Sequence, residues 1–184
     1  MENNPWQITG ERLVYDNPWI RLTEYQVIDP AGGNGIYGKV HFKNVAVGVI
    51  PIDDENHTWL VGQFRFTLQQ YSWEIPEGGA PVGSDPLQSA QRELKEETGF
   101  TATHWEQFLS MHMTNSVADE WAIVYIATGL QAGPSSPEDT EQLQIKRVPL
   151  EHAFEMVEKG EITDAISVAA LLKLQLRYQQ SKQK

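Results

Sequence analysis

The segment that most constrains the fold is QSAQRELKEETGF, residues 88–100, which follows a stretch interrupted by proline and glycine. Pro86 suits the first turn of a helix, and Asp85 immediately before it suits the N-cap. Gly99 suits the position just after the last helical turn, where the backbone often becomes left-handed. These signals predict a helix from about residue 87 to about residue 98.

Glutamates crowd one side of this helix. With residues 100° apart, Glu93, Glu96 and Glu97 fall within an arc of roughly 100° and repel one another. Arg92 relieves this repulsion only in part. Hard divalent cations such as Mg²⁺ or Mn²⁺, shared between the carboxylates, explain the arrangement, and the alternative is an ordinary solvated acidic face. An adjoining arc of roughly 80° is suited to pack on a sheet. It contains Leu87, Ala90, Leu94 and Thr98.

The rest of the chain reads as strands followed by two further helices. Because the order is strands, one helix, strands and two helices, the predicted fold class is α+β. A segment rich in proline, serine and acid at 131–143 predicts an exposed loop. Alternating or apolar runs predict strands within 12–28, 36–42, 45–52, 59–66, 105–113 and 120–130, and helical spacing returns over 149–162 and 164–180.

The composition excludes several classes of function. The formal net charge is −11, so an extended basic surface for nucleic-acid polymers is disfavoured, whereas a small anionic substrate is compatible if metal ions separate it from the acidic protein. There is no cysteine, which excludes disulfides and a cysteine nucleophile. The 5 histidines show no ligand spacing and are interpreted as incidental. No membrane span or secretion signal is apparent, so we expect a cytoplasmic protein.

Fixed offsets between glycine, arginine and the glutamates resemble the Nudix box. That pattern is Gly, five residues, Glu, seven residues, then Arg-Glu-apolar-any-Glu-Glu-any-Gly-apolar. The chain departs from it at Ser84, where the family has glutamate, and we expect this position to be supporting and activity to survive. The segments WEIPEGG, VGQFRF and NSVADE also look like the branch that hydrolyses ADP-ribose and nucleotide sugars. The matching positions are Gly78, Arg92, Glu93, Leu94, Glu96, Glu97, Gly99 and Phe100.

The resemblance implies an α/β/α sandwich with a mixed β-sheet and Mg²⁺-assisted attack of water on a pyrophosphate. It makes Glu93 and Glu97 metal ligands, with the backbone carbonyl of Glu77 as a third. It assigns Glu96 to completing or orienting the metal shell, and Arg92 to holding a glutamate by a charge-assisted bond. It also implies an N-terminal antiparallel β-strand arm at 1–44, contributing to a homodimer interface, followed by a Nudix hydrolase domain at 45–184.

Candidate residues also lie outside the box. Glu120 in TNSVADEW is the candidate general base and Asp119 the second choice, unless both merely begin a strand. Arg65 suits bidentate contact with a pyrophosphate, the alternative being a surface ion pair. Glu74 in SWEIPEGG is a candidate to bind the nucleotide or to support a neighbouring residue. Trp19 is a candidate to stack on a base, although such aromatic residues more often belong to a core.

The resemblance therefore implies hydrolysis of the pyrophosphate bond of ADP-ribose or another nucleoside diphosphate sugar, with Mg²⁺ or Mn²⁺ as cofactor. The products would be a nucleoside monophosphate and a sugar phosphate. One alternative is a related nucleoside diphosphate compound, such as a dinucleoside polyphosphate. The other is a catalytically reduced, nucleotide-binding regulatory module, for which Ser84 is the only support. We expect a small-molecule partner rather than a nucleic-acid polymer or a membrane.

Overall fold

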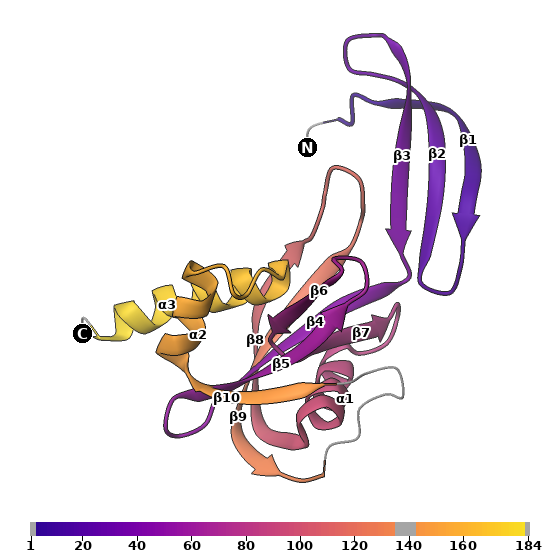
Figure 1. The fold of residues 1–184 in the computed structure, drawn as a ribbon. Coiled ribbons are helices and arrows are strands. Elements are labelled where there is room, and N and C mark those ends of the chain that lie inside the picture. The colour runs from indigo at the N-terminus through magenta and orange to yellow at the C-terminus, as the bar shows by residue number, and fades with distance from the viewer. Residues whose placement is uncertain (1–2, 135–142, 183–184) are drawn as a thin grey trace.

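The structure is a computed structural model that describes residues 3–134 and 143–182 (Figure 1). A three-stranded β arm rises from a layered core of strands and helices. The loop predicted at 131–143 falls mostly outside the described residues. The predicted division at 44 and 45 stays a prediction, with the arm ending at Phe42 and the first core strand beginning at Asn44.

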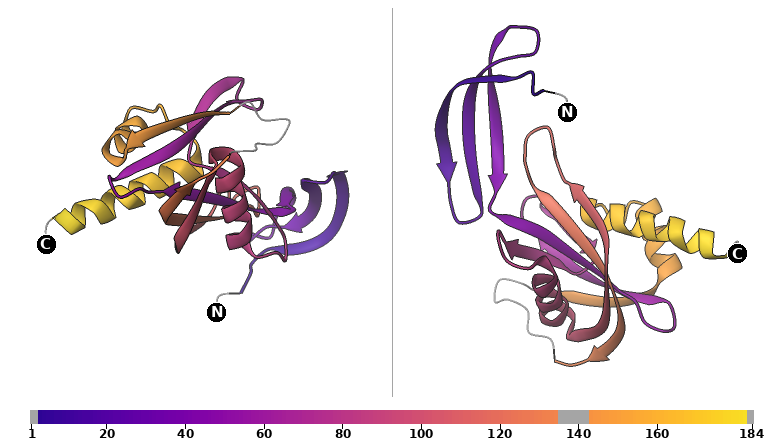
Figure 2. Two further views of the ribbon diagram at one scale, coloured as in Figure 1. Left: turned by 90° about the horizontal axis from the view of Figure 1, so that it is seen from below. Right: turned by 180° about the vertical axis from the view of Figure 1, so that it is seen from behind.

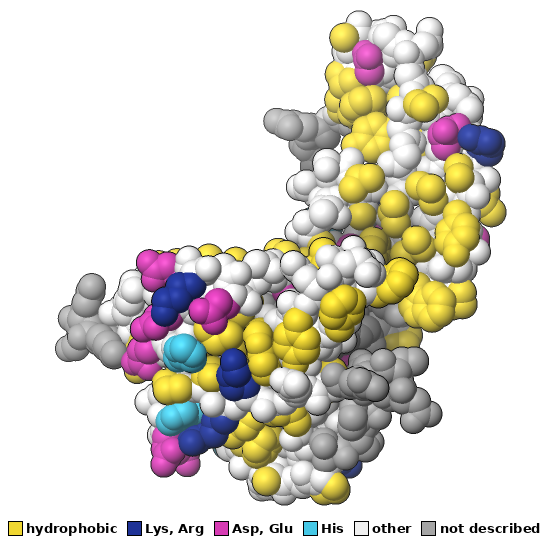
Figure 3. Space-filling model, in the orientation of Figure 1, with side chains coloured by type: hydrophobic (Ala, Val, Ile, Leu, Met, Phe, Trp, Pro, Cys, Tyr) yellow, Lys and Arg dark blue, Asp and Glu magenta, His cyan; other side chains and the backbone are white. Residues whose placement is uncertain are grey.

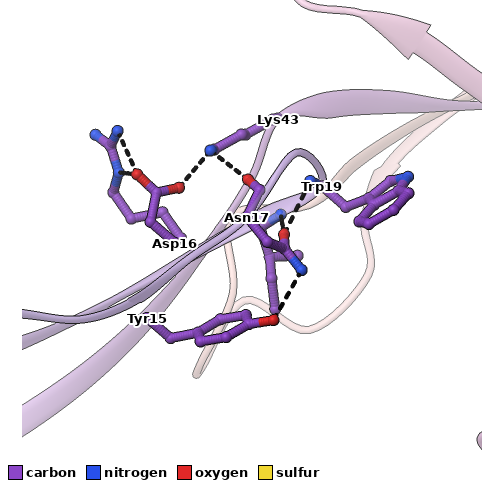
Figure 4. Close-up of polar contacts among 7 residues, drawn as sticks. Tyr15, Asp16, Asn17, Trp19 and Lys43 are labelled. Carbon is purple, nitrogen blue, oxygen red and sulfur yellow. Dashed lines mark hydrogen bonds and ion pairs between the residues drawn. The ribbon is translucent and has the colours of Figure 1, made fainter.

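The arm is an antiparallel meander with strand order β1-β2-β3. In the turn between β1 and β2, the Asn17 side chain accepts hydrogen bonds from the backbone N–H groups of Trp19 (2.9 Å) and Ile20 (2.7 Å) (Figure 4). Lys43, just beyond β3, contacts the Asp16 carboxylate and the Asn17 carbonyl. This contact ties the turn to the place where the chain enters the core. The arm strands are β1 (Gln7–Asp16), β2 (Ile20–Ile28) and β3 (Asn34–Phe42).

The core is built on a mixed sheet with strand order β7-β4-β9-β8, in which β4 and β9 are parallel and the other neighbours antiparallel. Strand β4 is buried on both faces, as expected for a central strand. Val47 and Val49 pack towards the helix α1, and Ile50 packs in the opposite layer. The strands of this sheet are β4 (Asn44–Pro51), β7 (Glu77–Pro81), β8 (Phe100–His112) and β9 (Trp121–Ala132).

Helix α1 (Pro86–Thr98) covers one face of the mixed sheet, and its predicted ends are confirmed. The Asp85 side chain accepts a hydrogen bond from the backbone N–H of Leu87 at 3.0 Å. Gly99 has a φ of 78° and ends the helix in the left-handed region. The predicted apolar arc also faces the sheet, since Ala90 and Leu94 are fully buried. Local capping and the buried arc therefore fix how the glutamates are presented.

A second sheet and two helices lie across the other face of the mixed sheet (Figures 1 and 2). The second sheet has strand order β10-β5-β6, all antiparallel. Together these layers confirm the predicted α+β class with a mixed sheet. Among the described residues, no helix is both long and apolar enough to cross a membrane. The remaining elements are β5 (His57–Arg65), β6 (Gln70–Glu74), β10 (Gln144–Pro149), α2 (Leu150–Glu158) and α3 (Ala165–Lys182).

Candidate active site

A cavity of about 450 Å³ opens where the ends of β5 and β6, the start of β7, the β8–β9 loop and the residue before α3 converge. Strand register brings these segments together, because β5 pairs with β6 and β7 pairs with β4. Four acidic side chains and one guanidinium therefore meet in a single space. The charged residues that line it are Arg65, Glu74, Glu77, Glu120 and Asp164.

Arg65 is held between the buried carboxylate of Glu74 and the partly buried carboxylate of Glu77. Its Nε donates to Oε1 and Oε2 of Glu74 at 2.9 and 3.1 Å, and its Nη2 donates to Oε1 of Glu77 at 2.7 Å. The Glu74 side chain is 3% exposed and the Arg65 side chain 35% exposed, so the carboxylate is shielded from water while the guanidinium is partly open to the cavity. Burial alone would lower the pKa of Arg65, but the carboxylates of Glu74 and Glu77 raise it above its ordinary value. The expected arginine is present, but as part of a buried network.

The charge of Glu77 is only partly compensated by its ion pair with Arg65. Burial, together with the charges of Asp164 and Glu74, raises the pKa of Glu77 well above its usual range. Its Oε2 atom is buried and has no hydrogen-bond partner among the described residues. Leaving a carboxylate oxygen in this state is costly unless a cation or another donor approaches it.

Helix α1 contributes two of the predicted metal ligands. Glu97 is 2% exposed, and its Oε2 accepts a hydrogen bond from the backbone N–H of Glu77 at 3.0 Å, which joins the helix to β7. Arg92 contacts the carboxylates of both Glu93 and Glu96. The structure thus brings Arg92 to the neighbours that its predicted holding role requires.

Gly78 leaves room for the Glu93 carboxylate. A Cβ atom at position 78 would lie 2.1 Å from Oε1 and 2.2 Å from the carboxyl carbon of Glu93, far inside contact distance. Glu93 therefore rests against a backbone position that only glycine can occupy without displacing it. Glycine is required at the first position of the box because the carboxylate of Glu93, a candidate metal ligand, lies against the backbone there.

We expect Gly78→Ala to lower kcat by about ten- to a hundredfold with the fold intact, because the added methyl displaces a movable carboxylate and no backbone. Steady-state kinetics and circular dichroism measure the two effects. The matched control is Gly79→Ala, whose Cβ would meet only the Asn44 side chain, at 3.1 Å for Nδ2. Equal losses of kcat in the two variants would contradict the assigned role of Gly78.

Glu120 and Asp119 face different surroundings. Glu120 lines the cavity, and burial, followed by the charge of Asp164, raises its pKa above the ordinary glutamate value. Asp119 instead contacts the arm through Lys39 and His41. Burial alone would raise the pKa of Asp119, but its hydrogen bonds lower it to about 2. Of the two base candidates, Glu120 is the one that the structure places beside the cavity carboxylates.

Asp164 is a cavity residue that the sequence patterns did not single out. It precedes α3, and its Oδ2 accepts a hydrogen bond from the backbone N–H of Ser167 at 2.8 Å. The Ser167 hydroxyl in turn accepts from the backbone N–H of Ile75 at 3.0 Å, which links α3 to the chain after β6. An aspartate directly before a helical pattern signals an N-cap, but nothing local signals that the cap faces a cavity.

Several predicted residues do not line this cavity. Arg92, Glu93, Glu96 and Glu97 belong to α1, Trp19 to the arm and Ser84 to the turn before α1. Trp19 is 66% exposed at the turn of the arm and is not among the cavity-lining residues of the described chain. Ser84, which replaces the glutamate of the box, lies in an exposed turn, where its hydroxyl donates to the Pro81 carbonyl at 2.7 Å. That turn precedes α1, so Ser84 here shapes the approach to the helix.

The carboxylates around Gly78 fit a hard divalent cation. All of the side-chain atoms that could coordinate a metal here are carboxylate oxygens, which Mg²⁺ and Mn²⁺ prefer. The buried Oε2 of Glu77 is available to a cation. Glu93 and Glu97 flank the same segment of β7. These three glutamates are the candidates to hold the ion. For Glu77, the side-chain carboxylate is a candidate ligand in addition to the backbone carbonyl that was predicted.

A second acidic cluster lies on the hairpin between β4 and β5. Ligand atoms of Asp53, Glu55 and His57 lie within 4.8 Å of one another, so this histidine has acidic neighbours that the sequence did not indicate. The guanidinium of Arg147 already contacts Asp53 and Glu55, with Nη2 2.6 Å from Oε2 of Glu55. A protein cation therefore balances this cluster, and it carries no argument for a metal.

Comparisons with known proteins agree with the fold and with the box. A family model described as the NUDIX domain matches residues 42–171. An ADP-ribose pyrophosphatase of Mycobacterium tuberculosis is 30% identical over 176 residues, covering 94% of this chain and 84% of that protein. An ADP-ribose pyrophosphatase of Bacillus subtilis is 35% identical over 134 residues, covering 72% of each.

A solved structure described as an ADP compounds hydrolase has the same fold, with a TM-score of 0.86, 21% identity and 98% coverage of both chains. The family model and the relatives extend well beyond the helix that carries the glutamates. The chain therefore belongs to the Nudix family, as one of its pyrophosphohydrolases.

Proposed function

We propose that this protein hydrolyses the pyrophosphate bond of ADP-ribose or a related nucleoside diphosphate sugar to a nucleoside monophosphate and a sugar phosphate, with Mg²⁺ as its cofactor. The observation that carries the proposal is the convergence of Arg65 and the cavity carboxylates, with the buried Glu97 of α1 bonded to the backbone of Glu77 beside them. The ADP-ribose pyrophosphatases among its relatives support the choice of substrate class. When bound, the cation would neutralise phosphate oxygens and activate water.

Each charged residue has a distinct task in this proposal. Arg65, whose side chain is 35% exposed, contacts the pyrophosphate while Glu74 fixes its guanidinium plane. Glu120 accepts the proton of the attacking water, a task favoured by a carboxyl group with a raised pKa. Arg92 keeps the Glu93 and Glu96 carboxylates apart and oriented.

A substrate panel tests the proposal. The protein is assayed with ADP-ribose, several nucleotide sugars and a dinucleoside polyphosphate, with Mg²⁺, with Mn²⁺ and with a chelator. We expect release of a nucleoside monophosphate from ADP-ribose or a nucleotide sugar only when a divalent cation is present. Preference for the dinucleoside polyphosphate would shift the substrate class. Binding without hydrolysis of any compound would favour a regulatory module and overturn the proposal.

We also propose that the arm pairs with a second copy of the chain. Large apolar side chains remain exposed on it, and hydrophobic side chains gather over the arm in Figure 3. Exposed apolar surface of this kind marks an interaction site. In such a dimer Trp19 would serve the partner's cavity by stacking on the base. Sedimentation equilibrium should give twice the mass of one chain, and a monomer at micromolar concentration would refute the pairing. The exposed apolar residues are Trp6, Ile8, Leu13, Val14, Tyr15, Trp19, Ile36 and Tyr37.

A further inference from the structure

The loop between β8 and β9, residues 113–120, is held by the arm as well as by the core. The backbone N–H of Val40 in β3 donates to the carbonyl of Val117 at 2.8 Å, and the N–H of Asp119 donates to the carbonyl of Val40 at 3.1 Å. Val40 and Ala118 form a parallel bridge. The loop accordingly lies beside β3 in Figure 1 and in the right-hand view of Figure 2.

The side chain of Asp119 completes this attachment. Its Oδ2 lies 2.8 Å from Nζ of Lys39 and 2.8 Å from Nδ1 of His41, and its Oδ1 accepts the backbone N–H of Phe42 at 3.0 Å. All three partners lie in the C-terminal half of β3. Tyr37, from the same strand, donates its hydroxyl to the carbonyl of Ser116 at 2.6 Å. One carboxylate thus holds the end of the loop to the arm at both of its oxygens.

The next residue along the chain is Glu120, which lines the cavity on the core side. Its carbonyl accepts the N–H of Met113 at 3.1 Å, which closes the loop at its base, and Met113 packs against the core. Asp119 and Glu120 are therefore consecutive residues with different surroundings, because Asp119 is held by the arm and Glu120 lines the cavity of the core. The direction in which the Glu120 side chain leaves the backbone depends on where Asp119 is held.

We propose that Asp119 is a positioning residue, which uses Lys39 and His41 of the arm to fix Glu120 in the geometry required for proton abstraction. This inference rests on the proposed hydrolytic function and extends it, because it makes the arm part of the catalytic apparatus within one chain. A catalytic base that is displaced by about 1 Å loses much of its effect, so the tether acts on turnover. Exposed ion pairs add little stability, so the same tether has little effect on folding.

The test is Asp119→Asn in the full chain, measured with the substrate found most active in the panel. We expect kcat to fall roughly tenfold while KM stays within about twofold, since the misplaced group acts on the chemical step. Backbone hydrogen exchange at Asp119, whose N–H bonds to β3, should become faster. The matched control is Asp53→Asn, which likewise removes a carboxylate that accepts backbone N–H groups and pairs with a basic side chain, in this case Arg147 at the far hairpin. That control should leave kcat unchanged.

A double-substitution cycle identifies the partner. Lys39→Met alone should lower kcat, and Asp119→Asn combined with Lys39→Met should be no slower than the slower single variant, because both remove one tether. Additive losses, or normal kcat and exchange in Asp119→Asn, would overturn the inference even with an active parent enzyme. An inactive parent enzyme, by contrast, would refute the proposed function itself, and the positioning role would fall with it.

Discussion

Glu97→Gln is expected to lower kcat by about a thousandfold, or about 4 kcal/mol of transition-state stabilisation, while the protein remains folded. Glutamine keeps the size of glutamate and an oxygen that accepts the backbone N–H of Glu77. What it removes is the negative charge that the proposed cation needs. Because Glu97 is 2% exposed, a neutral replacement adds no desolvation cost.

Metal dependence and stability distinguish this explanation from a loss of structure. The melting temperature without divalent cations should change by no more than a few degrees, and calorimetric titration should show weaker Mg²⁺ binding. Glu106→Gln is the control, since it removes a glutamate that is paired with Arg177 on the surface, away from the cavity. Wild-type turnover by Glu97→Gln would remove this residue from the metal site.

Arg65→Ala should affect both turnover and stability. The substitution leaves Glu74 and Glu77 without their shared cation in a buried setting, and breaking such a pair costs several kcal/mol when both partners are buried. Since the Arg65 side chain is 35% exposed, we expect a smaller loss, about 2 kcal/mol of unfolding free energy. Turnover should fall at least about a hundredfold because the pyrophosphate also loses its bidentate contact.

Two further variants separate these effects of Arg65. The double variant Arg65→Ala, Glu74→Gln removes one of the two carboxylate charges that lose their partner in Arg65→Ala. Urea denaturation should therefore show recovered stability while activity stays low. Arg65→Lys should keep much of the stability but not the catalysis, because an ammonium group lacks the planar fork. Arg147→Ala, which breaks the surface pairs with Asp53 and Glu55, should leave the midpoint of urea denaturation nearly unchanged. Full activity in Arg65→Lys would contradict bidentate recognition.

The sequence predicted best what is determined locally. The helix at Pro86–Thr98 follows from Asp85, Pro86 and Gly99, each acting within a turn of its own position. The side that packs and the side that carries carboxylates follow from helical spacing alone. The roles assigned to the box residues stay predictions, but the structure does bring Arg92, Glu93 and Glu97 to the edge of β7.

What the sequence could not predict depends on contacts between distant segments. Asp164 enters the cavity because α3 packs on the far layer of the core, and an N-cap pattern says nothing about where a helix docks. The contact of Arg65 with phosphate stays a prediction, but its sharing between Glu74 and Glu77 depends on strand pairing that no local pattern indicates. The separation of Asp119 from Glu120 requires the bridge between β3 and the loop, which no local pattern indicates.

The parallel pairing of β4 with β9 has a consequence for how the molecule folds. It joins Ala46 to Ala122, so closing it requires ordering a long stretch of chain before any contact between the two strands is made. Such non-local pairings slow folding. Strand β4 continues from the arm, and β9 begins directly after Glu120, so the cavity takes shape only with this late step. Glu120 and Asp164 therefore reach the cavity only after most of the chain has been synthesised.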